Sequence, residues 1–324
     1  MAGAGRTRAV VLRRFGGPEE LRVEAVPEPV AGEGESVIDV TLAGLNFADL
    51  EIREGVYAPP RLPAVLGADV VGRRRSDGRR VVALLREGGG YAQVAVARDA
   101  YTVEVPDSIG DAQAVALLEQ GCTAHCALVA AGRLRPGESV AVAAAAGGVG
   151  HLAVQLALAL GARTVAGVAS TAAKREFVRS LGARLAVGAP EDLAEVLRHD
   201  GRPAGVDLYL DSVGGPALRA SLAAVAPFGR LVSVGGRGKA ATADAVTLDE
   251  LTDRSVGVHG LWMRRVLEAP PLFARTAQQL FALARRGLLN ARVDRVVPLA
   301  GVGAAHAAMA ARETMGKVLV DVWG

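Results

Sequence analysis

One segment, from Ser139 to Ala159, constrains the fold more than any other part of the chain. It predicts a buried apolar strand over Ser139–Ala143, a loop rich in alanine and glycine, and a helix from Gly150 onward. The same alternation repeats further along, with strands expected at Arg163–Val168, Val206–Leu210 and Arg230–Gly235 and helices from Thr171 and Pro216. Apolar strands that alternate with amphipathic helices predict a parallel sheet covered by helices on both faces.

The loop between that strand and helix carries a spacing of small residues, A-x-G-x-x-G, formed by Ala145, Gly147 and Gly150. Gly147 would let the backbone approach a pyrophosphate, and Gly150 would let the helix pack closely on the strand. The start of the helix would then offer free N–H groups to the phosphates. The pattern therefore predicts a dinucleotide-binding Rossmann domain, with Ala146, Gly147, Gly148, Val149 and Gly150 at the cofactor. The alternative is a tight strand-to-helix turn that binds no ligand.

The end of the next strand indicates which dinucleotide is bound. An NAD site would place Asp or Glu about twenty residues beyond the glycines, but this chain has Val168-Ala169-Ser170-Thr171 there, followed by Lys174. A missing acid together with hydroxyl groups and a cation suits the 2′-phosphate of NADPH, which we expect to contact Ser170 and Lys174. In the alternative interpretation, Ser170 only caps the helix and Lys174 lies on its solvated face.

The flanking parts of the chain have a different texture. The first third predicts short strands separated by Gly and Pro, which suggests a small barrel or an irregular all-β unit. After Pro106 a helix is expected over Asp111–Ala131, and the tail mixes a helix over Leu272–Arg285 with strands near Arg292–Val297 and Lys317–Val322.

Composition excludes several classes of protein. The 324 residues exceed what one core usually serves, and 51% hydrophobic with 22% charged residues argues against disorder. The net charge of +3 is weak support for nucleic-acid binding. Two cysteines form no disulfide framework, no apolar signal core follows Met1–Arg8, and the run Val140–Ala159 is too interrupted to span a membrane. We therefore expect a cytoplasmic protein.

Several motifs in order resemble the medium-chain dehydrogenase/reductase superfamily, specifically its zinc-independent quinone oxidoreductase (zeta-crystallin-like) branch. The matching segments are Phe15-Gly16-Gly17-Pro18-Glu19, Gly44-Leu45-Asn46-Phe47-Ala48-Asp49, Arg53-Glu54-Gly55-Val56-Tyr57, Gly90-Tyr91-Ala92-Gln93, the Ala143–Gly150 loop, Asp211-Ser212-Val213-Gly214-Gly215, Gly229-Arg230-Leu231-Val232-Ser233-Val234-Gly235 and Gly316-Lys317-Val318. The resemblance implies an α/β protein with a GroES-like β-barrel catalytic domain from residues 1–115 and 263–324. A Rossmann doubly wound parallel-sheet domain at 116–262 would be inserted between them, with the cofactor in the cleft, and homodimers are usual.

Zinc-dependent relatives hold a catalytic metal with Cys, His and Cys. Here Asn46, Ala68 and Glu119 stand at or near those positions, and no four-Cys lobe exists, so no metal is expected. A competing cluster, Cys122 with His125 and Cys126, shares one helical face but has no evident fourth ligand. The alternative to metal binding is that the two cysteines are simply buried and that His125 lies beside the cofactor cleft.

The resemblance also implies roles on the acceptor side. Asn46 and Tyr57 should face the cleft and act on the developing oxyanion, and Thr123 should lie near the nicotinamide ribose, with Ser212, Val213 and Gly235 also at the cofactor. Glu51 stands where relatives commonly have Tyr, so it would repel anionic acceptors or act as an acid, or lie solvated on the surface. Ala189 replaces a Tyr that relatives place beside the 2′-phosphate, which leaves more of that contact to Ser170 and Lys174.

These features predict an NADPH-dependent enzyme that transfers hydride to a quinone or an α,β-unsaturated carbonyl compound. One alternative is an enoyl or 2-alkenal reductase, or a non-reductive cyclase, of a biosynthetic pathway. The other is a low-turnover NADPH-binding protein with a structural or nucleic-acid-binding role. The local basic run for that role is Arg73-Arg74-Arg75 with Arg79-Arg80, which Asp77 interrupts and which more often marks a solvated hairpin.

Overall fold

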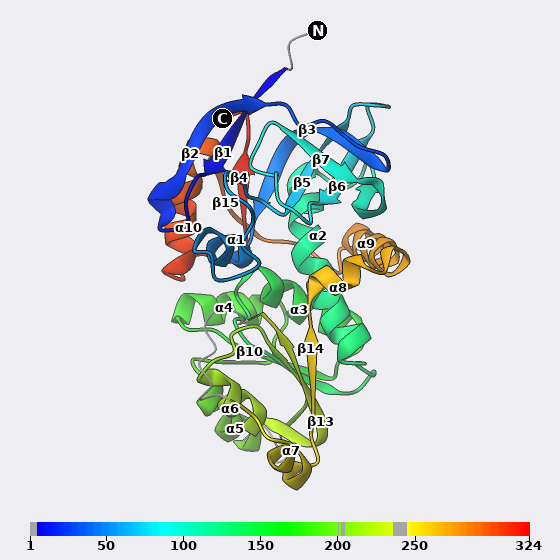
Figure 1. Ribbon diagram of the computed structural model, residues 1–324. Helices are drawn as coiled ribbons and strands as arrows, with labels where there is room; N and C mark the ends of the chain where they lie inside the picture. Colours follow the sequence, from blue (N-terminus) through cyan, green and yellow to red (C-terminus); the bar gives the residue numbers. More distant parts are fainter. Residues whose placement is uncertain (1–4, 200, 202–204, 236–244) are drawn as a thin grey trace. The chain divides into compact units, whose positions relative to one another are not determined.

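The computed structural model describes residues 5–199, 201, 205–235 and 245–324. The chain forms two compact units. Unit 1 comprises the residues up to Glu119 with Val266–Arg285 and Ala291–Gly324, and unit 2 comprises Gln120–Arg265 with Arg286–Asn290. The sequence places the domain limits at 115/116 and 262/263. In Figure 1 unit 1 is coloured from blue to cyan and from orange to red, and unit 2 is mainly green and yellow.

Unit 1 is built from β-strands of both ends of the chain. Its elements are β1 (Arg6–Leu12), β2 (Leu21–Pro27), β3 (Glu35–Leu45), α1 (Phe47–Arg53), β4 (Ala64–Val65), β5 (Asp69–Arg74), β6 (Arg80–Leu84), β7 (Val94–Arg98), β8 (Thr102–Glu104), α9 (Pro270–Arg285), β15 (Val293–Pro298), α10 (Val302–Ala310) and β16 (Lys317–Asp321). One sheet has the order β2-β1-β4. The other has the order β15-β16-β3-β5-β6-β8, with β7 also paired to β3.

Strand β3 is the centre of this unit. It pairs antiparallel with β5, β7 and β16, and its register with β5 shifts between Val40 and Leu42. A strand with three partners lets the sheet curl into a barrel around side chains such as Leu12, Ile38 and Val318, which are buried. This is the expected GroES-like unit.

Unit 2 contains a parallel sheet and its covering helices. Its elements are β9 (Ser139–Val142), α3 (Gly148–Ala159), β10 (Thr164–Val168), α4 (Ala172–Ser180), β11 (Leu185–Val187), α5 (Pro190–His199), β12 (Val206–Asp211), α6 (Ala217–Ala223), β13 (Val225–Val234), α7 (Leu248–Arg254) and β14 (Gly257–Leu261). The strand order is β11-β10-β9-β12-β13-β14, with every pairing parallel. The order reverses between β9 and β12, which makes the sheet doubly wound, as the sequence predicts.

Helices α2 (Asp111–Cys126) and α8 (Met263–Leu267) contain the boundaries between the units. The predicted helix over Asp111–Ala131 is present, and its last five residues, Ala127–Ala131, form a π-helical turn that ends at Gly132. Arg230 on β13 stabilises this end: its Nε donates to Gly132 O at 2.5 Å and Nη2 to Arg133 O at 3.1 Å. The same guanidinium pairs with both carboxylate oxygens of Glu138, at 2.9 and 2.6 Å.

Among the described residues, Asp111–Ala131 is also the one helical stretch long and apolar enough to cross a membrane, by length and composition. Of its most apolar window, 72% is buried inside the structure, as in the core helices of globular proteins that pass the same test. It is therefore weak support for a membrane span.

Candidate functional site

The loop that connects β9 to α3 has the geometry of a phosphate-binding turn. Ala144 adopts a left-handed conformation with φ of 46°, and its carbonyl accepts the N–H of Gly147 at 2.8 Å. Ala145 N donates to Val168 O on β10 at 2.9 Å, which fixes the loop to the neighbouring strand. Gly147 is the N-cap of α3. Because glycine has no side-chain oxygen, it leaves the first N–H groups of the helix to an anion.

The glycines of this loop have different roles. A Cβ on Gly150 would collide with the carbonyl of Ala144 and lie 2.7 Å from Ala145 Cα, so only glycine lets α3 pack this closely on the loop. A Cβ on Gly147 would meet only Ala144 O, at 3.2 Å. Gly147 therefore keeps space open above the loop, whereas Gly150 allows close packing within it. A bound pyrophosphate requires both of these roles.

The start of α4 lies at the end of β10. Ser170 is exposed, and the N-cap is Thr171, whose Oγ1 accepts the N–H of Lys174 at 3.2 Å. The alternative in which Ser170 caps the helix is therefore wrong, because the neighbouring threonine fills that position. Arg175 Nη1 donates to the carbonyls of Ala169 and Ser170, at 3.2 and 3.1 Å. The turn carries hydroxyl groups and cations and no carboxylate between Val168 and Arg175.

The remaining expected cofactor residues of unit 2 follow neighbouring strands. Ser212 and Val213 come directly after β12, and Gly235, with φ of 106°, comes directly after β13. Asp211 Oδ1 accepts the N–H of Val213 at 2.9 Å, which shapes this turn. Since the carboxyl ends of parallel strands meet at one edge of a sheet, these residues lie at the same edge as the glycine loop. Thr123 lies on α2 and is 8% exposed.

In unit 1, Asn46 follows β3 and is the N-cap of α1. Its side chain lies in a buried polar cluster, at 4% exposure. Asn46 Oδ1 accepts from Lys317 Nζ at 2.7 Å, and Nδ2 donates to Asp69 Oδ1 at 2.5 Å. Lys317 Nζ also forms an ion pair with Asp69 Oδ2, at 3.0 Å. The interpretation of Asn46 as a residue that only stabilises a turn does not account for these contacts.

A second carboxylate lies on the other side of Asn46. Asp49 Oδ2 accepts the N–H of Asn46 at 2.8 Å and the hydroxyl of Tyr91 at 2.8 Å. Burial raises the pKa of Asp49 from 3.8 to about 6, and Asp69 adds to this, although the bonds from Asn46 and Tyr91 and the charge of Lys317 act against it. Burial and the same carboxylates raise the pKa of Tyr91 well above 10.

Glu51 and Tyr57 lie on α1 and the loop after it. Glu51 is 7% exposed, so the interpretation of this residue as a solvated surface side chain is wrong. Asp49, Leu50 and Arg53 of the same short helix are buried as well, so α1 is covered on more than one side. Glu51 O accepts the N–H groups of Val56 and Tyr57, at 3.0 and 3.3 Å, and Tyr57 is half-buried.

The sequence patterns do not mark Asp49, Asp69, Tyr91 and Lys317 as site residues. Three of them, Asp49, Tyr91 and Lys317, nevertheless lie in the segments that resemble the family. The available signal was chemical: a lysine in an apolar strand next to a glycine needs a buried partner. No local pattern says that this partner lies hundreds of residues earlier in the chain.

The residues at the positions of the zinc ligands do not fit a zinc ion. Ala68 has no donor atom, and the oxygen of Asn46 already binds an ammonium group. Cys122, His125 and Cys126 are buried on α2. Within the part of the chain that the structure describes, no cluster of three or more His, Cys, Asp and Glu side chains is arranged to hold a metal.

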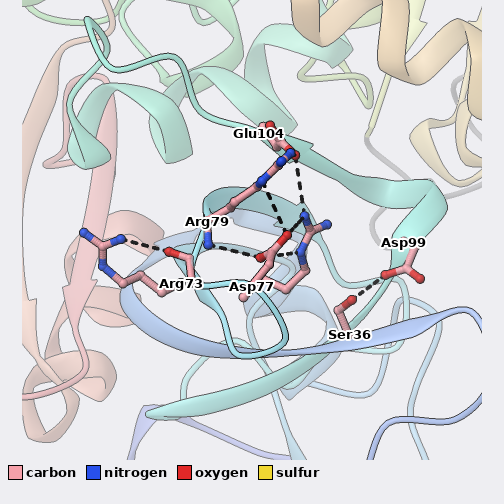
Figure 2. A network of polar contacts seen from close by, with 8 residues as sticks. Ser36, Arg73, Asp77, Arg79, Asp99 and Glu104 are labelled. Atoms are coloured by element: carbon pink, nitrogen blue, oxygen red, sulfur yellow. Dashed lines mark hydrogen bonds and ion pairs between the residues drawn. The ribbon is translucent and has the colours of Figure 1, made fainter.

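The basic run of the β5–β6 hairpin is neutralised by carboxylates. Arg74 binds Asp77 at 3.0 and 2.5 Å, and Arg79 binds Glu104 at 2.5 Å. Figure 2 shows this network, with Ser36 bonded to Asp99 nearby. The bond from Arg74 lowers the pKa of Asp77 to about 2. Such a surface lacks the clustered positive face that nucleic acid requires.

Comparison with known families agrees with this architecture. The alcohol dehydrogenase GroES-like domain matches residues 32–107, and the zinc-binding dehydrogenase family matches residues 148–279. The GroES-like match falls in unit 1, and the zinc-binding dehydrogenase match falls mainly in unit 2.

Relatives match nearly the whole chain. The synaptic vesicle membrane protein VAT-1 homolog of Rattus norvegicus is 33% identical, over 97% of this chain and 83% of its own length. A quinone oxidoreductase of Pseudomonas aeruginosa is 32% identical, over 97% of this chain and 99% of its own. A 2-haloacrylate reductase of Burkholderia sp is 31% identical, over 96% and 98%.

Among solved structures, the quinone oxidoreductase of Thermus thermophilus, determined also as its complex with NADPH, superimposes with a TM-score of 0.85. It is 34% identical, over 97% of this chain and all of its own. The chain belongs to the medium-chain dehydrogenase/reductase superfamily. The quinone oxidoreductase branch of that superfamily fits it, and the chain is an oxidoreductase of that type.

Proposed function

We propose that the protein is a zinc-independent NADPH-dependent reductase that transfers hydride to a quinone or an α,β-unsaturated carbonyl compound. The observation that carries the proposal is the pair of turns at one edge of the parallel sheet. One turn leaves helix N–H groups for a pyrophosphate, and the other offers Ser170, Thr171 and Lys174 without a carboxylate.

Each group of residues has a separate role in this proposal. NADPH, when bound, supplies the hydride. Residues Ala146 to Gly150 bind its pyrophosphate, and Ser170 and Lys174 bind its 2′-phosphate. Thr123, Ser212, Val213 and Gly235 contact its nicotinamide half. On the acceptor side, Asn46 and Tyr57 donate hydrogen bonds to the developing oxyanion, and the buried Glu51 affects which acceptors are accepted.

The first experiment follows the loss of NADPH absorbance with the purified protein. The panel contains 1,4-benzoquinone, naphthoquinones, 2-alkenals and cyclic enones, with NADH measured in parallel. Rapid oxidation by quinones with NADPH preferred supports the proposal. If NADPH binds but no acceptor on the panel is reduced, the proposed activity is wrong, and a cyclase or a low-turnover NADPH-binding protein replaces it.

The cofactor assignment has its own test on α4. Lys174→Ala should raise the Michaelis constant for NADPH at least tenfold and leave that for NADH nearly unchanged, since about 1.4 kcal/mol of a phosphate contact corresponds to that factor. Arg179→Ala removes a positive charge from the same helix, further from the turn, and should change neither constant. Equal effects of Lys174→Ala on both cofactors would show that the 2′-phosphate lies elsewhere.

An alkene reductase is the second candidate, because a relative that matches the chain nearly end to end is a 2-haloacrylate reductase. Reduction of enones or alkenals while quinones are ignored would favour it.

A homodimer is also proposed. Among the described residues β14 is the last strand of its sheet, and its Val258 is 41% exposed, so a second copy has an edge to bind. Light scattering on the eluting protein measures the mass.

A further inference from the structure

Three adjacent strands bring one ion pair over the end of β3. Lys317 begins β16, Asp69 begins β5, and Gly44 of β3 pairs with Asp69 in register. Both charged side chains have 0% exposure. A Cβ on Gly44 would collide with the Asp69 carboxylate and lie 2.6 Å from Lys317 Cε. The glycine therefore provides the space in which the pair crosses the strand.

This pair determines how the carboxamide of Asn46 is oriented. An ammonium group can only donate, and an ionised carboxylate can only accept. Lys317 therefore selects Oδ1 of Asn46 and Asp69 selects Nδ2, at 2.7 and 2.5 Å. A flipped amide would place two donors against each other and two acceptors against each other. The main chain of Asn46 is held as well, by Asp49 Oδ2.

We propose that Lys317 and Asp69 are positioning residues that lock the carboxamide of Asn46 in one orientation. The inference rests on the proposed function, in which Asn46 acts on the acceptor. With Oδ1 bound by Lys317 and one Nδ2–H bound by Asp69, the amide cannot flip, and its second Nδ2–H keeps one direction. Lys317 and Asp69 thus act on the reaction through Asn46.

A readout independent of turnover is available because the chain has only two asparagines, Asn46 and Asn290. Side-chain ¹⁵N-labelling of asparagine should give two NH₂ groups in the NMR spectrum of the full protein. The Asn46 group should exchange its protons with solvent more slowly than that of the exposed Asn290, and one of its protons should be shifted downfield. In Lys317→Met/Asp69→Leu, which removes both charges at once and adds no asparagine, this shift and protection should be lost while Asn290 is unchanged.

A double-mutant cycle then tests the effect on the reaction. Lys317→Met/Asp69→Leu should lower kcat by about 10- to 100-fold with a smaller change in KM, as a displaced catalytic group does. In an Asn46→Ala background the same change should have little further effect. Val320→Ala, also buried on β16, is the matched control, because it removes apolar packing in the core and leaves both charges in place. It should lower Tm, and its effect on kcat should be the same in both backgrounds.

The outcomes separate this inference from the proposed function. Slow exchange with a non-additive cycle supports both. An Asn46 amide that exchanges as fast as Asn290, or an additive cycle, overturns the positioning role even if the enzyme reduces quinones. A wild-type protein that reduces nothing refutes the proposed function, and the NMR comparison then still decides whether the pair holds the amide.

Discussion

Ionisation of Asp49 should destabilise the folded protein, and replacing it with asparagine should remove that effect. The carboxyl group is 1% exposed. Its pKa is raised from 3.8 to about 6, first by burial and also by Asp69. Between these two values the folded state holds a proton that the unfolded state has lost. Stability at this site therefore falls as the pH rises from about 4 to about 6, and it stays low above that range.

The size of the effect follows from the two pKa values. A difference of roughly two pH units, at about 1.4 kcal/mol each, gives about 3 kcal/mol above pH 7. Asp49→Asn keeps an oxygen that can accept from Asn46 N and Tyr91 Oη. Its new NH₂ group needs a partner, so the net gain above pH 7 should be about 1–3 kcal/mol.

The assay is urea unfolding of wild type and variant from pH 4 to pH 8. The difference between the two proteins is the relevant quantity, because His306 titrates in the opposite sense. Burial lowers the pKa of His306 to about 3, so its contribution rises with pH and cancels in the difference. Tyr91→Phe, which removes one bond to Asp49, should raise the pKa of Asp49 further and increase the loss at high pH. A difference between wild type and Asp49→Asn that stays constant with pH would refute this reasoning.

Four further changes test other parts of the structure. Gly150→Ala should destabilise the protein by about 1–3 kcal/mol, because its Cβ meets backbone atoms. Gly147→Ala should change stability by less than about 1 kcal/mol yet weaken NADPH binding roughly tenfold or more, and equal stability losses in the two variants would contradict the division of roles. Arg230→Met should lower the free energy of unfolding by about 2–4 kcal/mol, because it removes the ion-pair partner of Glu138 and the side-chain donor to the carbonyls of Gly132 and Arg133; an unchanged urea midpoint would be inconsistent with that. Glu51→Gln should improve turnover of anionic acceptors relative to neutral ones, and unchanged acceptor ranking and pH dependence would end the specificity role of Glu51.

The sequence predicts the parallel sheet well because its signals are local. The apolar run before Gly147, the spacing to Gly150 and the alternation of strands and helices each depend on neighbouring residues. The sequence does not predict α1, because its seven residues directly follow a strand and only Asn46 marks the start. The π-helical form of the turn after Cys126 is not predicted either, because Arg230, which binds the carbonyls that follow this turn, comes from a distant strand.

The candidate site divides in the same way. The two turns proposed to bind the cofactor consist of consecutive residues, so Ser170, Lys174 and the glycines could be named as candidates from sequence. The role of Asn46 could be suggested, but its bonds could not, since Lys317 is 271 residues away along the chain. Glu51 shows the opposite error: a charged residue is usually exposed, but Glu51 is buried because the short helix α1 is covered on more than one side.

The position of β16 has a consequence for how the chain folds as it is synthesised. Unit 2 has all six strands of its sheet once residue 261 has been made, whereas β3 still lacks the strand that lies between it and β15. Until β16 has been synthesised, one edge of β3 stays open and Asp69 lacks its lysine. The parallel-sheet unit can therefore fold first, and the addition of β16 completes the barrel. A protein cut short just before Lys317 would remain in that open, aggregation-prone state.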